Sequence, residues 1–193
     1  IISLHDQETV QMCPDTLCVQ AGDWSPNGRN IVFDGHFYSR ETGQFIGIAD
    51  MQQNIDLLLM DNFYKGWPKF SKDGGRIVFE SNYGESSDYN IWVVKIDGSQ
   101  LTRITQDGGE YPCWSPDGEW IVYSKLISDQ YDLFLIKSDG SQEAIPVINT
   151  KNTNEVHASW SPNGKHIVYD TMTGSRNTDS GDGLYILDIQ FLN

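Results

Sequence analysis

Short apolar runs alternate with polar turns along almost the whole chain, and four stretches share one pattern. Each stretch has an aromatic residue, a turn of the Ser-Pro-Asp-Gly type, and then an Ile-Val-aromatic triplet. The aromatic anchors are spaced by 46, 44 and 46 residues, at Trp24, Phe70, Trp114 and Trp160. A period of about 40 to 50 residues is typical of propeller blades that contain four short strands each.

The turn in each copy forces the chain to reverse. Proline presets φ at about −65°, Asp or Asn tolerates the left-handed region, and glycine accepts a positive φ. The Ile-Val-aromatic triplet is rich in β-branched and aromatic residues, which favours a buried strand. We therefore expect the anchor and the triplet to lie on the two strands of a hairpin.

A third strand is predicted within 90–99 and 132–141, where an Asp-Gly turn leads into a more polar fourth strand. The first copy repeats this arrangement more loosely, and the last copy ends soon after its third strand. We therefore predict an all-β protein, a β-propeller of four-stranded antiparallel blades, with about four blades in this chain. The residues form a single domain, 1–193, with blades at roughly 20–62, 63–107, 108–154 and 155–193 and an edge strand contributed by 1–13.

The two ends of the chain leave the closure of the ring open. Residues 9–12 could fill the outer strand that is missing after Leu187, which would close a small ring of four blades. The alternative is that the chain is part of a longer ring, whose open blade edges would lead to self-association. Because the chain starts at Ile1 and not at Met, we expect that a signal peptide, further domain or both precede it.

The repeated unit has a family resemblance. Trp-Ser-Pro-Asp-Gly-x-x-Ile-Val-Tyr, then an Ile-Trp-Val-Val-like strand, Asp-Gly and Leu-Thr-x-Ile-Thr, resembles the repeat of the TolB-like (WD40-like) β-propeller family. The resemblance runs from about Trp24 to Ile189 and implies a propeller that is commonly six-bladed and often exported to the periplasm or cell surface. It also implies roles in protein–protein contacts or as the lid domain of prolyl-oligopeptidase-type serine peptidases. We therefore expect an extracytoplasmic protein.

The net charge of the chain disfavours some classes of binding partner. The chain has 13 Lys and Arg against 27 Asp and Glu, a formal net charge of −14, which repels phosphate backbones and anionic lipid headgroups. No apolar run approaches the roughly 18 residues that a membrane-spanning helix needs. We expect a protein or peptide partner, no nucleic acid and no membrane insertion.

Catalytic motifs are not found in the sequence. There is no Gly-x-Ser-x-Gly nucleophile elbow, the four histidines lack zinc-site spacing, and the glycines lie in hairpin turns and not in a phosphate-binding loop. We therefore predict a non-catalytic binding or scaffold protein without a cofactor. The alternative is the propeller domain of a larger enzyme, such as a prolyl-oligopeptidase-type serine peptidase or a lyase.

Candidate binding residues lie three positions before each anchor, because the innermost strands of a propeller begin or end at the mouth of its channel. An aromatic and charged rim suits a peptide or protein ligand, although such side chains could instead pack between blades. The anchors Trp24, Trp114 and Trp160 are expected in the core between blades. The candidates are Ala21, Trp67, Tyr111 and His157, with Lys65, Glu110 and Glu155 nearby.

Two cysteines form a disulfide candidate, Cys13 with Cys18, and the alternative is two half-buried thiols. The third cysteine, Cys113, lies in a predicted strand, where a free Cys usually behaves as a small apolar residue.

The loop 177–183 is a weak calcium candidate. It contains Asp179 and Asp182, and calcium accepts clustered oxygen ligands on a flexible backbone. The alternative is a solvated loop between the second and third strands of the last blade.

Overall fold

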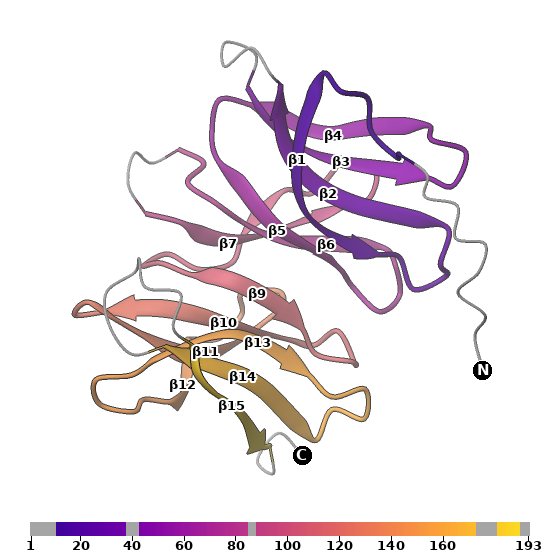
Figure 1. Ribbon diagram of the computed structural model, residues 1–193. Coiled ribbons are helices and arrows are strands. Elements are labelled where there is room, and N and C mark those ends of the chain that lie inside the picture. The colour runs from indigo at the N-terminus through magenta and orange to yellow at the C-terminus, as the bar shows by residue number, and fades with distance from the viewer. Residues whose placement is uncertain (1–10, 38–42, 85–87, 173–180, 190–193) are drawn as a thin grey trace.

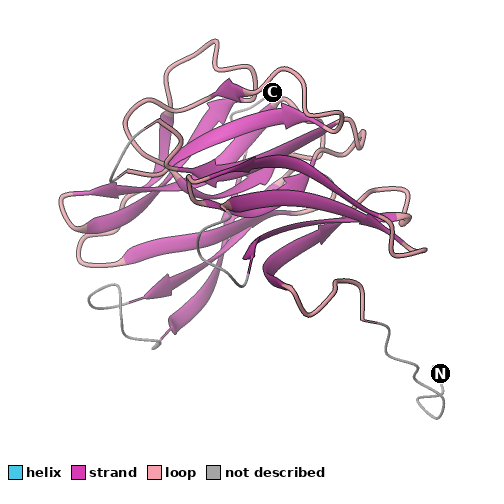
Figure 2. Ribbon diagram, turned by 90° about the horizontal axis from the view of Figure 1, so that it is seen from above, coloured by secondary structure: helices cyan, strands magenta, loops and turns pink. Residues whose placement is uncertain are grey.

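The computed structural model describes residues 11–37, 43–84, 88–172 and 181–189. These residues form strands, turns and loops and contain no helix (Figure 2), so no membrane-spanning helix is found among them. The strands make four antiparallel sheets in which neighbours in sequence are neighbours in the sheet. The predicted all-β propeller with about four blades is confirmed.

Each sheet is one blade, and the blades follow one another from the top to the bottom of Figure 1. The first contains β1 (Leu17–Trp24), β2 (Asn30–Phe37), β3 (Gln44–Asp50) and β4 (Ile55–Asp61). The second contains β5 (Lys65–Phe70), β6 (Arg76–Ser81), β7 (Asn90–Lys95) and β8 (Thr102–Arg103). The third contains β9 (Glu110–Trp114), β10 (Trp120–Ile127), β11 (Gln130–Lys137) and β12 (Ile145–Ile148). The fourth has, in the described residues, β13 (Asn154–Trp160), β14 (His166–Met172) and β15 (Gly181–Asp188).

The repeated turn is held in the same way in every blade. Its glycine has a φ between 68° and 73°, a region that residues with a Cβ enter at a cost. The serine Oγ accepts the backbone N–H of the residue five positions later, which closes the hairpin. This bond measures 2.9 Å in all four copies, from Asn30 to Ser25, Arg76 to Ser71, Trp120 to Ser115 and His166 to Ser161.

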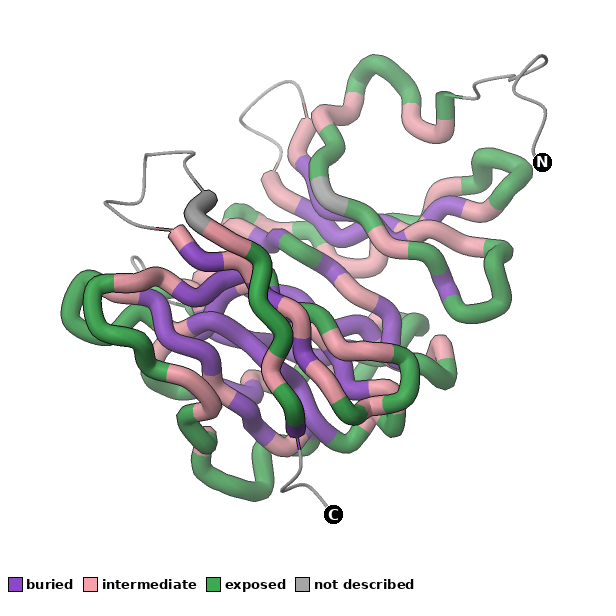
Figure 3. The backbone as a smooth tube through the Cα atoms, turned by 60° about the horizontal axis from the view of Figure 1, so that its bottom comes forward, coloured by how far each residue is buried: buried purple, intermediate pink, exposed green. Residues whose placement is uncertain are grey.

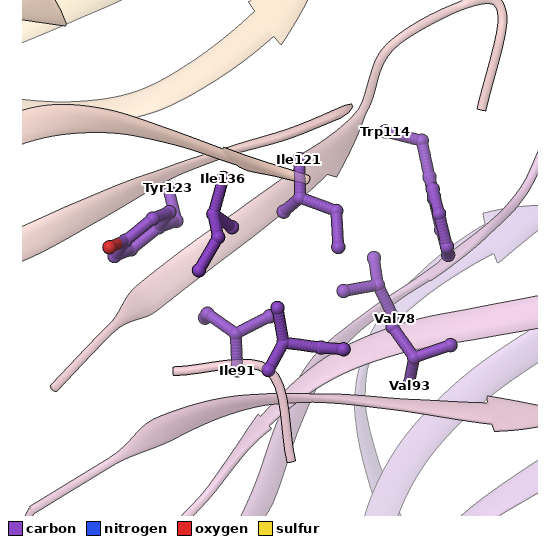
Figure 4. Packing of buried hydrophobic residues seen from close by; sticks show 8 residues of the cluster. Val78, Ile91, Val93, Trp114, Ile121, Tyr123 and Ile136 are labelled. Carbon is purple, nitrogen blue, oxygen red and sulfur yellow. The ribbon is translucent and has the colours of Figure 1, made fainter. Parts of the chain in front are cut away.

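The core lies between the blades, and each buried anchor packs against the blade that precedes it. Trp114 of β9 packs with Val78 and Val93 of the second blade, as Figure 4 shows together with other residues of this cluster. Its Nε1 also donates a hydrogen bond of 3.1 Å to the carbonyl oxygen of Lys69. Trp160 is partly buried and packs against the third blade in the same way.

Trp24 was expected in the core, and that expectation was wrong. This side chain is 55% exposed, because no blade precedes the first one in the described residues. At the other end of the arc, Leu184 and Ile186 of β15 are 75% and 74% exposed, and this part of the chain is largely green in Figure 3. The blades thus form an arc whose two end faces both expose apolar side chains.

The segment that leads into β1 lies on the first blade. Met12 and Cys13 pack against the cluster of Phe33 and Phe45, at the opposite end of the arc from β15 (Figure 1). Residues 1–10, which carry most of the predicted edge strand, lie outside the described residues. The described part of the segment therefore covers the outer face of the first blade and is not the outer strand of the last.

Candidate functional site

The first strands of successive blades, β1, β5, β9 and β13, pack side by side along the inside of the arc. All four have a register shift against the second strand of their blade, and in three of them a residue with a positive φ lies at this shift. Trp67, Tyr111 and His157 have φ values of 53°, 55° and 51°, in the left-handed region that residues other than glycine rarely adopt. Each lies at a register shift against the second strand of its blade, which is a β-bulge. Bulges of this kind redirect a side chain and are frequent beside functional sites.

The bulges bring the three side chains together, and we call this group the mouth cluster. Ring centroids are 5.2 Å apart between Trp67 and Tyr111, 4.6 Å between Tyr111 and His157, and 5.4 Å between Trp67 and His157. The side chains come from three different blades and stay in contact with solvent, with Trp67 36% exposed. The fourth candidate, Ala21, has a side chain outside the described residues.

A carboxylate from the preceding blade holds the bulged backbone in two of the three cases. The Trp67 N–H donates to the Asp34 carboxylate on β2, and the Tyr111 N–H donates to Glu80 Oε2 on β6 at 2.7 Å. A bulge frees a backbone N–H from the strand ladder, and a buried N–H needs a partner. These two bonds therefore fix the conformation of the mouth cluster and join neighbouring blades.

Burial shapes the electrostatics behind the mouth cluster. It raises the pKa of Asp34 to about 6 and the pKa of Glu80 to about 8, because water is excluded from both carboxyl groups. The negative charge of Glu110 raises the pKa of Glu80 further, while hydrogen bonds from the Tyr111 N–H and the Tyr64 hydroxyl lower it. Two buried carboxyl groups, Asp34 on β2 and Glu80 on β6, therefore lie behind the mouth cluster. At neutral pH Asp34 is largely ionised, whereas Glu80 largely keeps its proton.

The third ring of the mouth cluster has a carboxylate partner in its own blade. His157 Nδ1 lies 3.1 Å and 3.2 Å from the two carboxylate oxygens of Asp170 on β14. This contact joins the His157 ring to the second strand of its own blade.

The three charged candidates are buried beside the mouth cluster and bind neighbouring groups. Lys65 Nζ pairs with Asp61 and donates to the Phe63 carbonyl oxygen at 3.1 Å. Glu110 Oε1 accepts the Tyr131 hydroxyl at 2.6 Å.

Glu155 Oε1 accepts the Thr150 N–H at 3.0 Å, and the residue is fully buried. The mouth cluster is thus formed by aromatic rings, and the buried side chains of Lys65, Glu110 and Glu155 bind other groups of the protein.

A regular feature of the sequence indicates the buried carboxyl groups. Ten positions after each anchor, directly behind the apolar triplet, every repeat has a polar residue. A polar residue at the end of a buried strand needs a partner, so this regularity points to a function in the fold or the site. The four residues are Asp34, Glu80, Ser124 and Asp170.

The remaining candidates are placed as follows. Cys13 and Cys18 are free, partly buried thiols in the structure: Cys13 packs against the cluster of Phe33 and Phe45, and Cys18 pairs with His36 in the β1–β2 ladder. The side chains of Asp179 and Asp182 lie outside the described residues. Among the side chains that are described, no group of three or more His, Cys, Asp and Glu could hold a metal ion.

Comparison with known proteins identifies the family. A model of the TolB beta propeller domain matches residues 2–188. The chain belongs to the TolB beta propeller domain family. A Tol-Pal system protein TolB of Francisella tularensis is 28% identical over 174 residues, which are 88% of this chain and 38% of that protein. The chain spans between 37% and 52% of the length of the curated relatives it matches.

Solved structures place the TolB-type fold in proteins of different kinds. TolB from Acinetobacter baumannii superposes with a TM-score of 0.75 at 17% identity, over 93% of this chain and 43% of that one. Oligogalacturonate lyase from Vibrio parahaemolyticus gives 0.67 at 16% identity, over 91% and 53%. Prolyl oligopeptidase B from Galerina marginata gives 0.61 at 13% identity, over 81% and 24%. At these identities the likeness shows the fold alone.

Proposed function

We propose that this propeller is a binding module that recognises a protein or peptide through the mouth cluster. The observation that carries the proposal is the convergence of Trp67, Tyr111 and His157 from three blades, each on a bulge with a left-handed backbone. Left-handed conformations at such residues cost about 1–3 kcal/mol each. A cost repeated at one spot in three blades supports a role for the exposed aromatic surface that results.

Aromatic clusters of this kind are effective recognition surfaces. Trp and Tyr contribute large contact areas with few rotatable bonds, and they dominate the binding energy of many interfaces. The match to Tol-Pal system proteins supports an extracytoplasmic location and a partner in the cell envelope. The net charge of −14 favours partners with neutral or basic surfaces.

Selection from a random peptide display library tests this proposal. Peptides enriched on the wild-type protein are titrated against the triple variant W67A, Y111A and H157A. We expect affinity to fall by at least about tenfold, as for residues at the centre of an interface. Circular dichroism and thermal unfolding of the variant establish that the fold is intact.

The matched control replaces three exposed aromatic residues away from the mouth cluster, with W24A, Y83A and Y185A. These side chains are 55%, 40% and 48% exposed. The control is expected to keep the affinity of the wild type. Equal loss of affinity in both triple variants, or no loss in the mouth variant, would show that the mouth cluster is not the recognition surface.

A second candidate function is the propeller domain of a larger enzyme. The similarity of fold to oligogalacturonate lyase and to prolyl oligopeptidase B supports it, since this chain spans only 53% and 24% of those proteins. The sequence of the gene on either side of this segment separates the two functions. A neighbouring hydrolase domain with a Gly-x-Ser-x-Gly motif would favour the enzyme, and its absence from the full gene would favour the binding module.

A further inference from the structure

A pocket opens next to the mouth cluster, between the inner strands of the first two blades. Its volume is about 390 Å³, enough for an amino-acid side chain or a small peptide segment. We call it the Asp34 pocket. It is lined by Gln20, Gly22, Asp34, Tyr64, Trp67 and Lys69.

One wall of this pocket carries a carboxylate with unused hydrogen-bonding capacity. Asp34 is only 3% exposed, and its Oδ1 has no hydrogen-bond partner among the described residues. A buried acceptor without a donor destabilises the protein, and more so when it is charged. Asp34 is one of the residues that line the pocket. A ligand that donates a hydrogen bond here would remove this cost.

The surroundings of Asp34 select a positively charged donor. Glu80 is a second buried carboxyl group close enough to interact electrostatically with Asp34, and the Tyr64 hydroxyl donates to it. Lys69 is the one cationic residue that lines the described pocket, and its Nζ lies 3.7 Å from Asp23 Oδ1. Lys69 therefore has an acidic partner of its own, and Asp34 Oδ1 is still without a donor among the described residues.

Glycine shapes the wall that carries Tyr64. A Cβ added at Gly66 would lie 2.2 Å from the Tyr64 hydroxyl oxygen, so a larger residue would displace the ring. The glycine therefore allows the position in which the Tyr64 hydroxyl bonds to Glu80 and the ring lines the pocket.

The Trp67 indole also lines this pocket. Because Trp67 belongs to the mouth cluster as well, a ligand bound at the mouth cluster lies next to the pocket that Asp34 lines. Cations are attracted electrostatically to the face of a Trp ring. One carboxylate and one ring face suit an ammonium or guanidinium group better than a metal ion, which requires several oxygen ligands around it.

We propose that the Asp34 pocket binds an organic cation, an ammonium or guanidinium group, presented by the ligand of the mouth cluster. This inference rests on the proposed function and specifies the chemistry of the partner. Asp34 accepts charge-assisted hydrogen bonds from the cation, and Trp67 covers its other side. The partner then carries a lysine, an arginine or a free amino terminus at the point of contact.

Small probes test this proposal without the partner. N-acetyl-lysine methylamide and N-acetyl-arginine methylamide are titrated into ¹⁵N-labelled protein, and the uncharged N-acetyl-norleucine methylamide is the reference. We expect the charged probes to shift the indole signal of Trp67, which the W67F variant assigns, and the reference to leave it in place. The D34N variant should weaken binding by roughly tenfold or more, as expected for loss of a charge-assisted hydrogen bond.

The control is D117N, which removes one negative charge from a turn where two other repeats carry Asn27 and Asn163. It should bind the probes like the wild type. The proposal is overturned if D117N weakens binding as much as D34N, if the norleucine probe binds equally well, or if no probe binds. If the probes fail to bind but peptide binding still depends on the mouth cluster, this inference alone is rejected. If the probes bind but peptide binding does not depend on the mouth cluster, the proposed function is rejected.

Discussion

Replacing Glu80 by Gln should change how the stability of the protein depends on pH. Glu80 is 2% exposed on β6, between the second and third blades. Its Oε2 accepts the Tyr111 N–H at 2.7 Å, and burial raises its pKa from 4.5 to about 8. The native state therefore holds the proton on Glu80 more tightly than the unfolded chain does.

The sign and size of the effect follow from proton linkage. A raised pKa stabilises the native state below about pH 4.5, and this contribution is lost as the pH rises through about 8. Each pKa unit corresponds to about 1.4 kcal/mol, so the full contribution of Glu80 is on the order of 5 kcal/mol. Gln is neutral at every pH and its side-chain oxygen can still accept the Tyr111 N–H. We expect E80Q to lose this part of the pH dependence and to exceed the stability of the wild type near pH 9.

Urea unfolding followed by tryptophan fluorescence at about pH 5, 7 and 9 measures the difference. The control is E119Q, since Glu119 is 65% exposed and pairs with Lys137 at 2.9 Å on the surface. The control should retain the slope of the wild type. If E80Q retains that slope as well, Glu80 does not titrate in this range and the interpretation of the buried carboxylates is wrong.

Three further predictions concern the packing of the blades. In urea unfolding, W114A should lose about 3–5 kcal/mol of stability and W24A less than about 1 kcal/mol, because these equivalent residues are 6% and 55% exposed. Equal losses in the two variants would contradict this account of the core. R76K should lose about 1 kcal/mol of stability, since the Arg76 guanidinium lies 4.6 Å from the centroid of the Trp114 ring and donates to the Gly118 carbonyl oxygen at 3.2 Å. A melting temperature equal to that of the wild type would argue against this contact. Light scattering should show that the wild type associates as its concentration rises and that the double variant L184S and I186S associates less, because these two side chains of β15 are 75% and 74% exposed. A wild-type protein that is monomeric at all concentrations would show that the exposed face of β15 does not pair.

Local sequence patterns were sufficient to predict the hairpins that build the blades. The spacing of the anchors and the Ser-Pro-Asp-Gly turns predicted the hairpins, because serine and glycine act on residues within five positions. These patterns were also sufficient to select Trp67, Tyr111 and His157 as a group, since equivalent repeat positions must lie at equivalent places in successive blades.

Contacts between blades decided the rest. The sequence around Trp24 resembles that around Trp114, but within the described residues a preceding blade covers only the second of them. Trp24 is therefore exposed and Trp114 is buried. The pairing of Asp34 with the Trp67 N–H likewise depends on how one blade stacks on the next. Burial and the pKa of a carboxyl group are set by the atoms that exclude water from it. Asp34 and Glu80 have hydrogen-bond partners on the next blade, Trp67 and Tyr111, which lie 33 and 31 residues away in the sequence, and local pattern alone cannot specify such contacts.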